Sequence, residues 1–305
     1  MKISDSILAF HYDPGETTRE ASLLTENLMR WGGRFRFFLH WVFETPSKVG
    51  QRKPLKSLSD FSVFTPDIPM NIRSFPLAAK IFAAAEAESL AEQAGAPLLI
   101  WLDPDSLIIH EPLDLLLKSN ENIAISPVHL KNISCLVEQP LDEYWKTIYS
   151  HFNLKEGELF HITSMIDQKE IYPHFNAGLI SVKPQLGILR QWKENFLSLY
   201  DTEKMKVFYE TDRRCKLYIH QAVLAATILV LCKQAEIKLL PQTYNYPLHV
   251  ASQQAAEQKP AVINDLITAR YDDFSDPEWI SALPCREPFK SWLNDAVSEI
   301  QLQSF

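Results

Sequence analysis

LLIWLDPDSLII, residues 98–109, joins a run of apolar residues directly to two carboxylates. The run has the length and composition of a buried strand, and Asp103 stands where that strand should end. Residues two apart in an extended chain point to the same side, so Asp103 and Asp105 can face one point in space. Pro104 fixes φ near about −65° and removes a backbone donor, which suits a chain that is leaving a sheet.

Two carboxylates held this close repel each other unless a cation lies between them. Carboxylate oxygens are ligands that Mg²⁺ and Mn²⁺ prefer, and such ions keep open positions that substrate phosphates can fill. The sequence therefore predicts a divalent metal at Asp103 and Asp105. The alternative is that Asp105 caps the N-terminus of a helix, because Asp and Pro are common at such positions.

The segments around this stretch alternate between strand-like and helix-like patterns. We expect strands at residues 6–12, 34–43, 61–66, 98–102, 123–128, 175–184 and 238–240, and helices at 17–31, 76–94, 141–151, 186–199, 219–234 and 288–300. The strand–helix–strand order, with strands apolar on both faces, predicts an α/β fold with a mostly parallel central sheet flanked by helices. Such sheets bind ligands beyond the carboxyl ends of their strands, where Asp103 is expected.

The composition limits the classes of function. The chain has 305 residues and a formal charge of −8, so it has no overall basic field for nucleic acid or an anionic membrane. Its four cysteines show no C-x-x-C spacing, which favours reduced thiols in a cytoplasmic protein. The longest apolar stretch, 222–232, has 11 residues, whereas a membrane span needs about 20. We therefore expect a cytoplasmic protein without a transmembrane segment.

Five segments, in order, carry a family resemblance. They are SILAFHY (6–12) with the helix after it, the helix of Lys80 leading into LLIWLDPDSLIIHEPLDLL (98–116), HFNAGLISVKP (174–184), YIHQAVLAATI (218–228) and LLPQTYNY (239–246). Together they resemble the GT-A fold glycosyltransferases, most similarly the family 8 galactosyl- and glucosyltransferases and related nucleotide-diphospho-sugar transferases. The resemblance implies a Rossmann-like GT-A domain over residues 1–265, with a possible inserted lobe at 129–174 and a C-terminal helical extension at 266–305.

The implied activity is metal-dependent transfer of a sugar from a nucleoside-diphosphate sugar, often UDP-linked, to an acceptor hydroxyl. In this family resemblance, Mn²⁺ or Mg²⁺ on Asp103 and Asp105 binds the diphosphate. The ion then acts as a Lewis acid toward the charge that develops on the leaving group. The sequence does not name the sugar, the acceptor, the stereochemical course or the oligomeric state.

The resemblance also implies residues that contact the donor. Ala9, His11 and Tyr12 match the turn that holds base and ribose; Tyr12 would stack on the base or, alternatively, pack as an ordinary aromatic residue. Lys80 matches a basic residue near the donor, and the alternative is an exposed, solvated lysine.

The F-N-A-G segment supplies Asn176, Ala177 and Gly178. Gly178 would permit close backbone approach and Asn176 would hydrogen-bond sugar hydroxyls, with a simple turn before a strand as the alternative. Gln221 matches a glutamine beside the reacting sugar.

Two positions depart from the family pattern. His220 stands where relatives usually have an aspartate near the donor sugar, and it is either a hydroxyl contact or a surface or capping histidine. Asn264 stands where the third metal ligand, a histidine of an H-x-x-G-x-x-K-P-W motif, is expected. Asn264 itself, through its amide oxygen, or the nearby His249 could supply that ligand.

Two other classes compete with the transferase. These departures leave open a catalytically impaired protein that binds a nucleotide sugar without turnover. A phosphatase of the haloacid dehalogenase type also ends a hydrophobic strand in D-x-D, with one Asp as nucleophile. That motif normally lies on the first strand of the chain, whereas Asp103 follows a complete strand–helix–strand unit.

Overall fold

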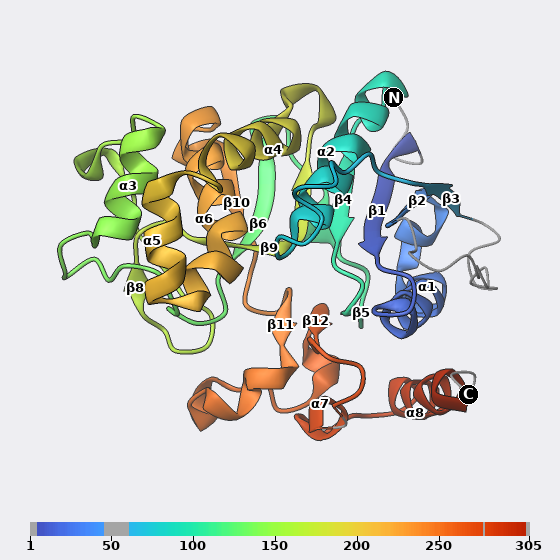
Figure 1. The fold of residues 1–305 in the computed structure, drawn as a ribbon. Helices are drawn as coiled ribbons and strands as arrows, with labels where there is room; N and C mark the ends of the chain where they lie inside the picture. Colours follow the sequence, from blue (N-terminus) through green and yellow to red (C-terminus); the bar gives the residue numbers. More distant parts are fainter. Residues whose placement is uncertain (1–4, 46–60, 277, 303–305) are drawn as a thin grey trace.

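The computed structural model describes residues 5–45, 61–276 and 278–302 (Figure 1). In this part of the chain the central sheet has seven strands, in the spatial order β10 (Ile237–Leu239), β6 (Ile123–Pro127), β9 (Phe175–Val182), β4 (Leu99–Leu102), β1 (Ile7–Tyr12), β2 (Leu39–Glu44) and β3 (Ser62–Phe64). β9 runs antiparallel to β6 and β4, and the other neighbouring pairs are parallel. The predicted α/β fold with a mostly parallel sheet is confirmed.

Strand β4 is apolar throughout because both of its faces are covered. Leu99 and Trp101 belong to the core on one face of the sheet, and Ile100 and Leu102 belong to the core on the other face. The alternation of side chains along a strand sends neighbours to opposite faces. This double burial is what the uninterrupted apolar run encodes, and it ends at Asp103.

Helices cover both faces of the sheet (Figure 1). α2 contacts α4, α4 contacts α6, and this layer packs on β1, β4 and β9, while α1 packs on the other face. α5 and α3 lie against α6. The helices are α1 (Thr18–Trp31), α2 (Ala78–Gln93), α3 (Glu143–His151), α4 (Ile188–Leu199), α5 (Glu203–Thr211), α6 (Arg213–Leu231), α7 (Glu278–Ser281) and α8 (Phe289–Leu302).

A second, smaller sheet lies below the first in Figure 1. It consists of β11 (Tyr246–Pro247), β12 (Thr268–Arg270) and β5 (Ser106–Ile108), with β12 parallel to β11 and antiparallel to β5. The expected C-terminal helical extension from residue 266 therefore begins with a strand, because β12 forms backbone hydrogen bonds with the segment that follows Asp105. The expected helix at 288–300 forms as α8, which packs on α1.

The segment 129–174 contains α3 and a short hairpin of β7 (Ile162–Thr163) and β8 (Glu170–Ile171). Trp145 and Ile148 of α3 belong to the same buried cluster as the helix layer on the main sheet. Asp142 caps α3, because its carboxylate accepts a hydrogen bond from the Trp145 backbone N–H at 2.9 Å. This segment thus packs laterally against α5 and α6.

Two local expectations were wrong. The aromatic segment 34–43 divides into a 3₁₀ helix, Gly33–Phe37, and strand β2, because Gly33 adopts φ of +57° and turns the chain. Asp105 does not cap a helix, since strand β5 follows it directly.

Helix α6 is long and apolar enough to cross a membrane by length and composition. In the structure most of that helix is buried within the protein, and its residues Ile219 to Ile228 pack in the main core. It therefore has the character of a core helix.

Candidate active site

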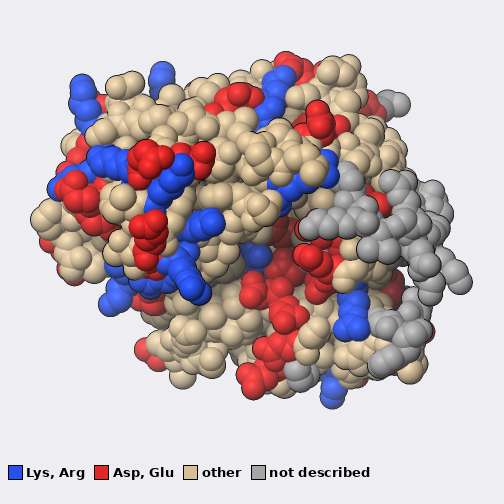
Figure 2. Space-filling view, in the orientation of Figure 1, with Lys and Arg blue, Asp and Glu red and all other residues tan. Residues whose placement is uncertain are grey.

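The acidic pair lies at the turn between β4 and β5, at the carboxyl end of β4. Asp103 and Asp105 are 6% and 5% exposed, and the Asp103 backbone N–H donates to the Gly178 carbonyl at 2.7 Å. In Figure 2, acidic side chains gather in the middle of this face, between the main sheet and the C-terminal elements. Because β4 ends at Leu102, the turn lies at the rim of the sheet, as the sequence predicts.

Two basic side chains neutralise the pair. The Lys80 ammonium, on α2, lies 2.7 Å from each carboxylate oxygen of Asp103. The Arg270 guanidinium, at the end of β12, spans both acids: its Nη1 is 3.0 Å from Asp103 Oδ2 and its Nε is 2.7 Å from Asp105 Oδ2. Lys80 is buried, so the expectation of an exposed, solvated lysine is wrong.

Burial and charge act in opposite directions on these groups. Burial alone would raise the pKa of Asp103, but Lys80 and Arg270 together hold the pKa below its ordinary value. Burial raises the pKa of Asp105 to about 6, since Arg270 offsets it only in part and Asp103 adds repulsion. Burial also lowers the pKa of Lys80.

The acidic pair does not fit a divalent metal as it is arranged. Lys80 and Arg270 already engage both oxygens of Asp103 and Oδ2 of Asp105, so a metal between the carboxylates would have to displace them. The buried Oδ1 of Asp105 is the one oxygen of the pair without a hydrogen-bond partner among the described residues. Among the residues that the structure describes, no group of three or more His, Cys, Asp or Glu side chains is placed to hold a metal ion. The repulsion between the two acids is thus relieved by cations of the protein itself.

Gly178 on β9 makes this ion cluster possible. A Cβ atom at this position would lie 2.6 Å from Arg270 Nη1, 2.8 Å from Asn176 Oδ1 and 3.0 Å from Asp103 Oδ2. Asn176 Oδ1 accepts hydrogen bonds from the Gly178 backbone N–H and from Asn245 Nδ2, at 2.8 and 3.0 Å. Because these partners donate, the Asn176 amide NH₂ remains as a donor. Ala177 is fully buried in the core.

A cavity of about 220 Å³ adjoins this cluster. It is smaller than the cavities of about 300–1,000 Å³ that hold whole drug-sized ligands, so it suits one sugar ring rather than a complete nucleotide sugar. Its lining includes Val128, His129, Leu130, Asn132, His174, Asn176, Tyr218, Gln221, His249, Val250 and Asp272. The structure thus brings the predicted residues Asn176 and Gln221 together.

His220 is 1% exposed, so it is not a surface histidine. Its Nδ1 lies 2.8 Å from the Leu217 carbonyl. Burial, and then the positive charge of Lys80, lowers the pKa of His220 to about 3, so the ring is neutral. It lies on α6 next to Gln221 and within electrostatic range of Lys80 and Asp103.

The two candidates for a third metal ligand are not placed beside the acidic pair as ligands. His249 lines the cavity, and its ring packs edge-on against His129 with centroids 6.0 Å apart. Asn264 lies beyond the opposite end of β5, where its carbonyl contacts His110 and its Oδ1 accepts from the Arg286 backbone N–H at 2.7 Å. Asn264 therefore fastens the C-terminal segment.

The residues expected to hold base and ribose are mostly internal. Ala9 is fully buried and lies in mid-strand between Trp41 and Trp101. Tyr12 is 4% exposed, and its hydroxyl donates to Glu44 Oε2 at 2.9 Å, so its ring packs in the core instead of standing open to a base. His11 is also buried, with Nε2 2.6 Å from Thr45 Oγ1.

Arg270 is the residue that sequence reasoning missed. It lies in AVINDLITARYDD, the stretch in which Asn264 was considered as a third metal ligand in place of the family's histidine. The available signal was that an arginine is the one strongly basic residue in that stretch. Asn245, which orients Asn176, was also missed, although it belongs to the LLPQTYNY segment.

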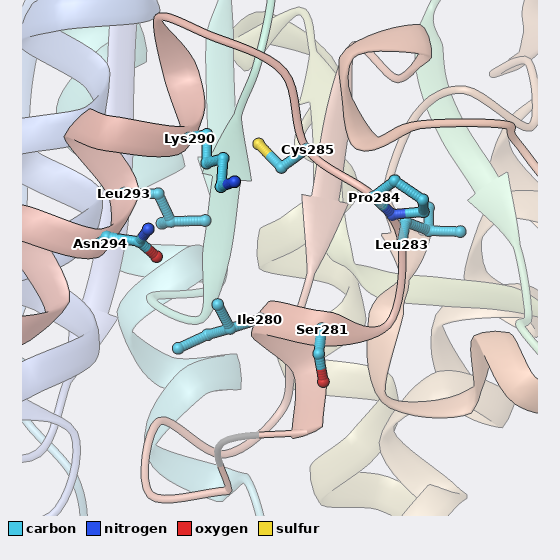
Figure 3. A pocket seen from close by; sticks show the side chains of 8 residues that line it. All are labelled: Ile280, Ser281, Leu283, Pro284, Cys285, Lys290, Leu293 and Asn294. Carbon is cyan, nitrogen blue, oxygen red and sulfur yellow. The ribbon is translucent and has the colours of Figure 1, made fainter.

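A second cavity of about 420 Å³ lies between α7 and α8 (Figure 3). It is lined by Ile280, Ser281, Leu283, Pro284, Cys285, Lys290, Leu293 and Asn294. It contains none of the predicted site residues and lies away from the ends of β4 and β9, so the smaller cavity is the candidate active site.

The fold is that of a GT-A type glycosyltransferase. A family model described as the Rhodobacterales glycosyltransferase domain matches residues 9–231, and the chain belongs to that family. The protein is therefore a transferase, and the phosphatase alternative is wrong. A comparison with curated proteins gave no match.

Solved structures show the same fold at low sequence identity. The bifunctional glycosyltransferase WbbM is 10% identical with a TM-score of 0.56, and the match covers 96% of this chain and 51% of that one. The chain thus spans about half the length of WbbM. An active-site mutant of LgtC is 12% identical with a TM-score of 0.50, over 97% of this chain and 95% of that one.

Proposed function

We propose that this glycosyltransferase takes its sugar from a nucleoside-diphosphate sugar, with UDP-linked sugars as the first donors to test, and transfers it to an acceptor hydroxyl. The observation that supports this is the juxtaposition of a sugar-sized cavity with one buried and one partly buried cation. The cavity contains the amides of Asn176 and Gln221, and the cations are Lys80 and Arg270.

In this reaction the bond between the anomeric carbon and the diphosphate oxygen breaks, and its electron pair stays with the diphosphate. The acceptor oxygen forms the new bond and loses its proton. Positive charge at Arg270 stabilises the negative charge that develops on the leaving group, and Lys80 holds Asp103 in its charged form. Asn176 and Gln221 hydrogen-bond sugar hydroxyls, and the carboxylate of Asp272, at the cavity, accepts the proton.

The test is release of UDP from a panel of UDP-sugars, with Gln221→Ala compared with wild type. Loss of a hydrogen bond to the reacting sugar should lower the rate by about tenfold or more. Gln191→Ala is the matched control, since Gln191 is an exposed residue of α4 whose side chain hydrogen-bonds Asn195.

The proposal fails if no UDP-sugar releases UDP and none shifts the melting temperature, with or without Mn²⁺. A ligand that binds only the folded state raises stability by RT ln(1 + [L]/Kd), so binding without turnover is also detectable. Binding that leaves every donor intact would instead support the impaired sugar-binding alternative.

A further inference from the structure

The position between Asp103 and Asp105 is held by one guanidinium. Arg270 donates through Nε to Asp105 and approaches Asp103 through Nη1, so two edges of the guanidinium are used. Its Nη2 faces Asp272 Oδ1 at 4.0 Å, which is longer than a hydrogen bond, and the Asp272 side chain is 63% exposed. Nη2 is therefore on the side of Asp272, a residue that lines the cavity, and it makes no hydrogen bond within the described part of the chain.

Three strands, β12, β5 and β9, fix the position of the Arg270 guanidinium. The antiparallel register of β12 and β5 places Arg270 opposite Ser106, and the Tyr271 backbone N–H donates to the Asp105 carbonyl at 3.2 Å. Gly178 on β9 leaves the space that the guanidinium occupies. The pairing of β12 with β5 fixes the backbone of Arg270, and Gly178 leaves room for its side chain, so the fold itself determines where the guanidinium lies.

The charges are already balanced. Two buried carboxylates face two cations, since Lys80 lies 2.7 Å from Asp103 and Arg270 lies 2.7 Å from Asp105. A divalent ion would have to expel Arg270 from two charge-assisted hydrogen bonds, or add two positive charges beside a neutral buried cluster. Both are unfavourable, because buried charges need partners.

We propose that Arg270 takes the place of a divalent ion in this site, and that its Nη2 binds the diphosphate of the donor, so that the chain binds nucleotide without metal. This inference rests on the proposed function, because it concerns the donor diphosphate. Arginine suits this role, since its planar fork matches phosphate oxygens and it stays charged at every working pH.

Two measurements on the full-length wild-type chain test the inference directly. Titration calorimetry with UDP, GDP and ADP in EDTA and in Mn²⁺ should give the same affinity within about twofold, because in this proposal Arg270 and not a metal contacts the diphosphate. Electron paramagnetic resonance of Mn²⁺ should show that the wild-type protein leaves the ion free in solution.

Variants sharpen the result. Arg270→Ala should weaken nucleotide binding in EDTA by about 10–100-fold, and it should create a Mn²⁺ site by freeing Asp103 and Asp105. Arg214→Ala is the matched control, because Arg214 pairs with Asp212 at the surface and should leave both readouts unchanged. If Arg270→Ala does not fold, the two wild-type measurements still decide the question.

The outcomes separate the two proposals. Nucleotide binding that requires Mn²⁺, together with Mn²⁺ bound by the wild type, would overturn the role of Arg270 and leave the nucleotide-sugar donor in place. Binding of no nucleotide under either condition would overturn both. Metal-independent binding that Arg270→Ala does not weaken would refute the arginine contact alone.

Discussion

Replacing Gly178 with alanine tests whether the ion cluster depends on close packing. The added methyl would stand 2.6 Å from Arg270 Nη1, 2.8 Å from Asn176 Oδ1 and 3.0 Å from Asp103 Oδ2. Real Cβ atoms do not approach other heavy atoms under 3.0 Å, and Asn176 is fixed by its bonds to Gly178 and Asn245. The Arg270 guanidinium must therefore move away from its position between Asp103 and Asp105.

The cost follows from what that movement breaks. Disrupting one side of a buried ion pair typically costs about 3–5 kcal/mol, because a buried charge is left without its partner. For 305 residues, an unfolding entropy of about 2.1 cal/mol/K per residue converts about 3 kcal/mol into a melting temperature lower by about 5 °C. Nucleotide affinity should fall in parallel, since Arg270 loses its orientation.

The assay is thermal unfolding followed by circular dichroism, with Gly157→Ala as the matched control. Gly157 has no atom within 4 Å of an added Cβ and no positive φ, so its alanine variant should melt with the wild type. If Gly178→Ala melts within about 1 °C of Gly157→Ala, the methyl group is accommodated. The argument that Gly178 makes room for Arg270 would then be wrong.

Three further experiments test the scaffold. Burial raises the pKa of Glu88 from 4.5 to about 7. The protonated Glu88 side chain therefore stabilises the fold below pH 4.5, and this stabilisation is lost as the pH rises through 7. In urea unfolding between pH 4.5 and 8, the wild type should lose about 3 kcal/mol of unfolding free energy that Glu88→Gln retains. Asp142→Ala removes the cap of α3 and should cost about 1 kcal/mol with an unchanged urea m-value. Trp192→Phe should cost about 1 kcal/mol more than Trp101→Phe in denaturant titrations, because only the Trp192 indole N–H has a hydrogen-bond partner among the described residues.

The elements with strong patterns were predictable. Strands β1, β4 and β9 and helices α1, α2 and α4 form close to the expected positions because each buries a long apolar run or stripe. Helix α5 was not predicted, since Met205 is its one fully buried residue and no apolar stripe marks it. Strands of two or three residues, such as β11 and β12, are too short to show any period.

The same limit explains what was predictable in the site. The sequence showed that Asp103 and Asp105 lie at the rim of the sheet and need a cation between them, because spacing and burial settle both points. It did not show which cation. Arg270 lies 165 residues from Asp105 and reaches it through β12, a strand without a sequence signal. The local sequence thus predicts that the two carboxylates need a cation, but only the long-range pairing of β12 with β5 determines that this cation is Arg270.

We expect Lys80 to contribute mainly to stability and Arg270 mainly to nucleotide binding. Lys80 has a side chain 8% exposed and both of its contacts go to Asp103, so it holds that carboxylate in its charged form and has little surface left for a ligand. Arg270 is 18% exposed, and its Nη2 lies on the side of Asp272 at the cavity. Removing Lys80 should therefore act mainly on stability, and removing Arg270 mainly on nucleotide affinity. A guanidinium with five donors can serve two acids and a phosphate together, whereas an ammonium buried against one carboxylate cannot.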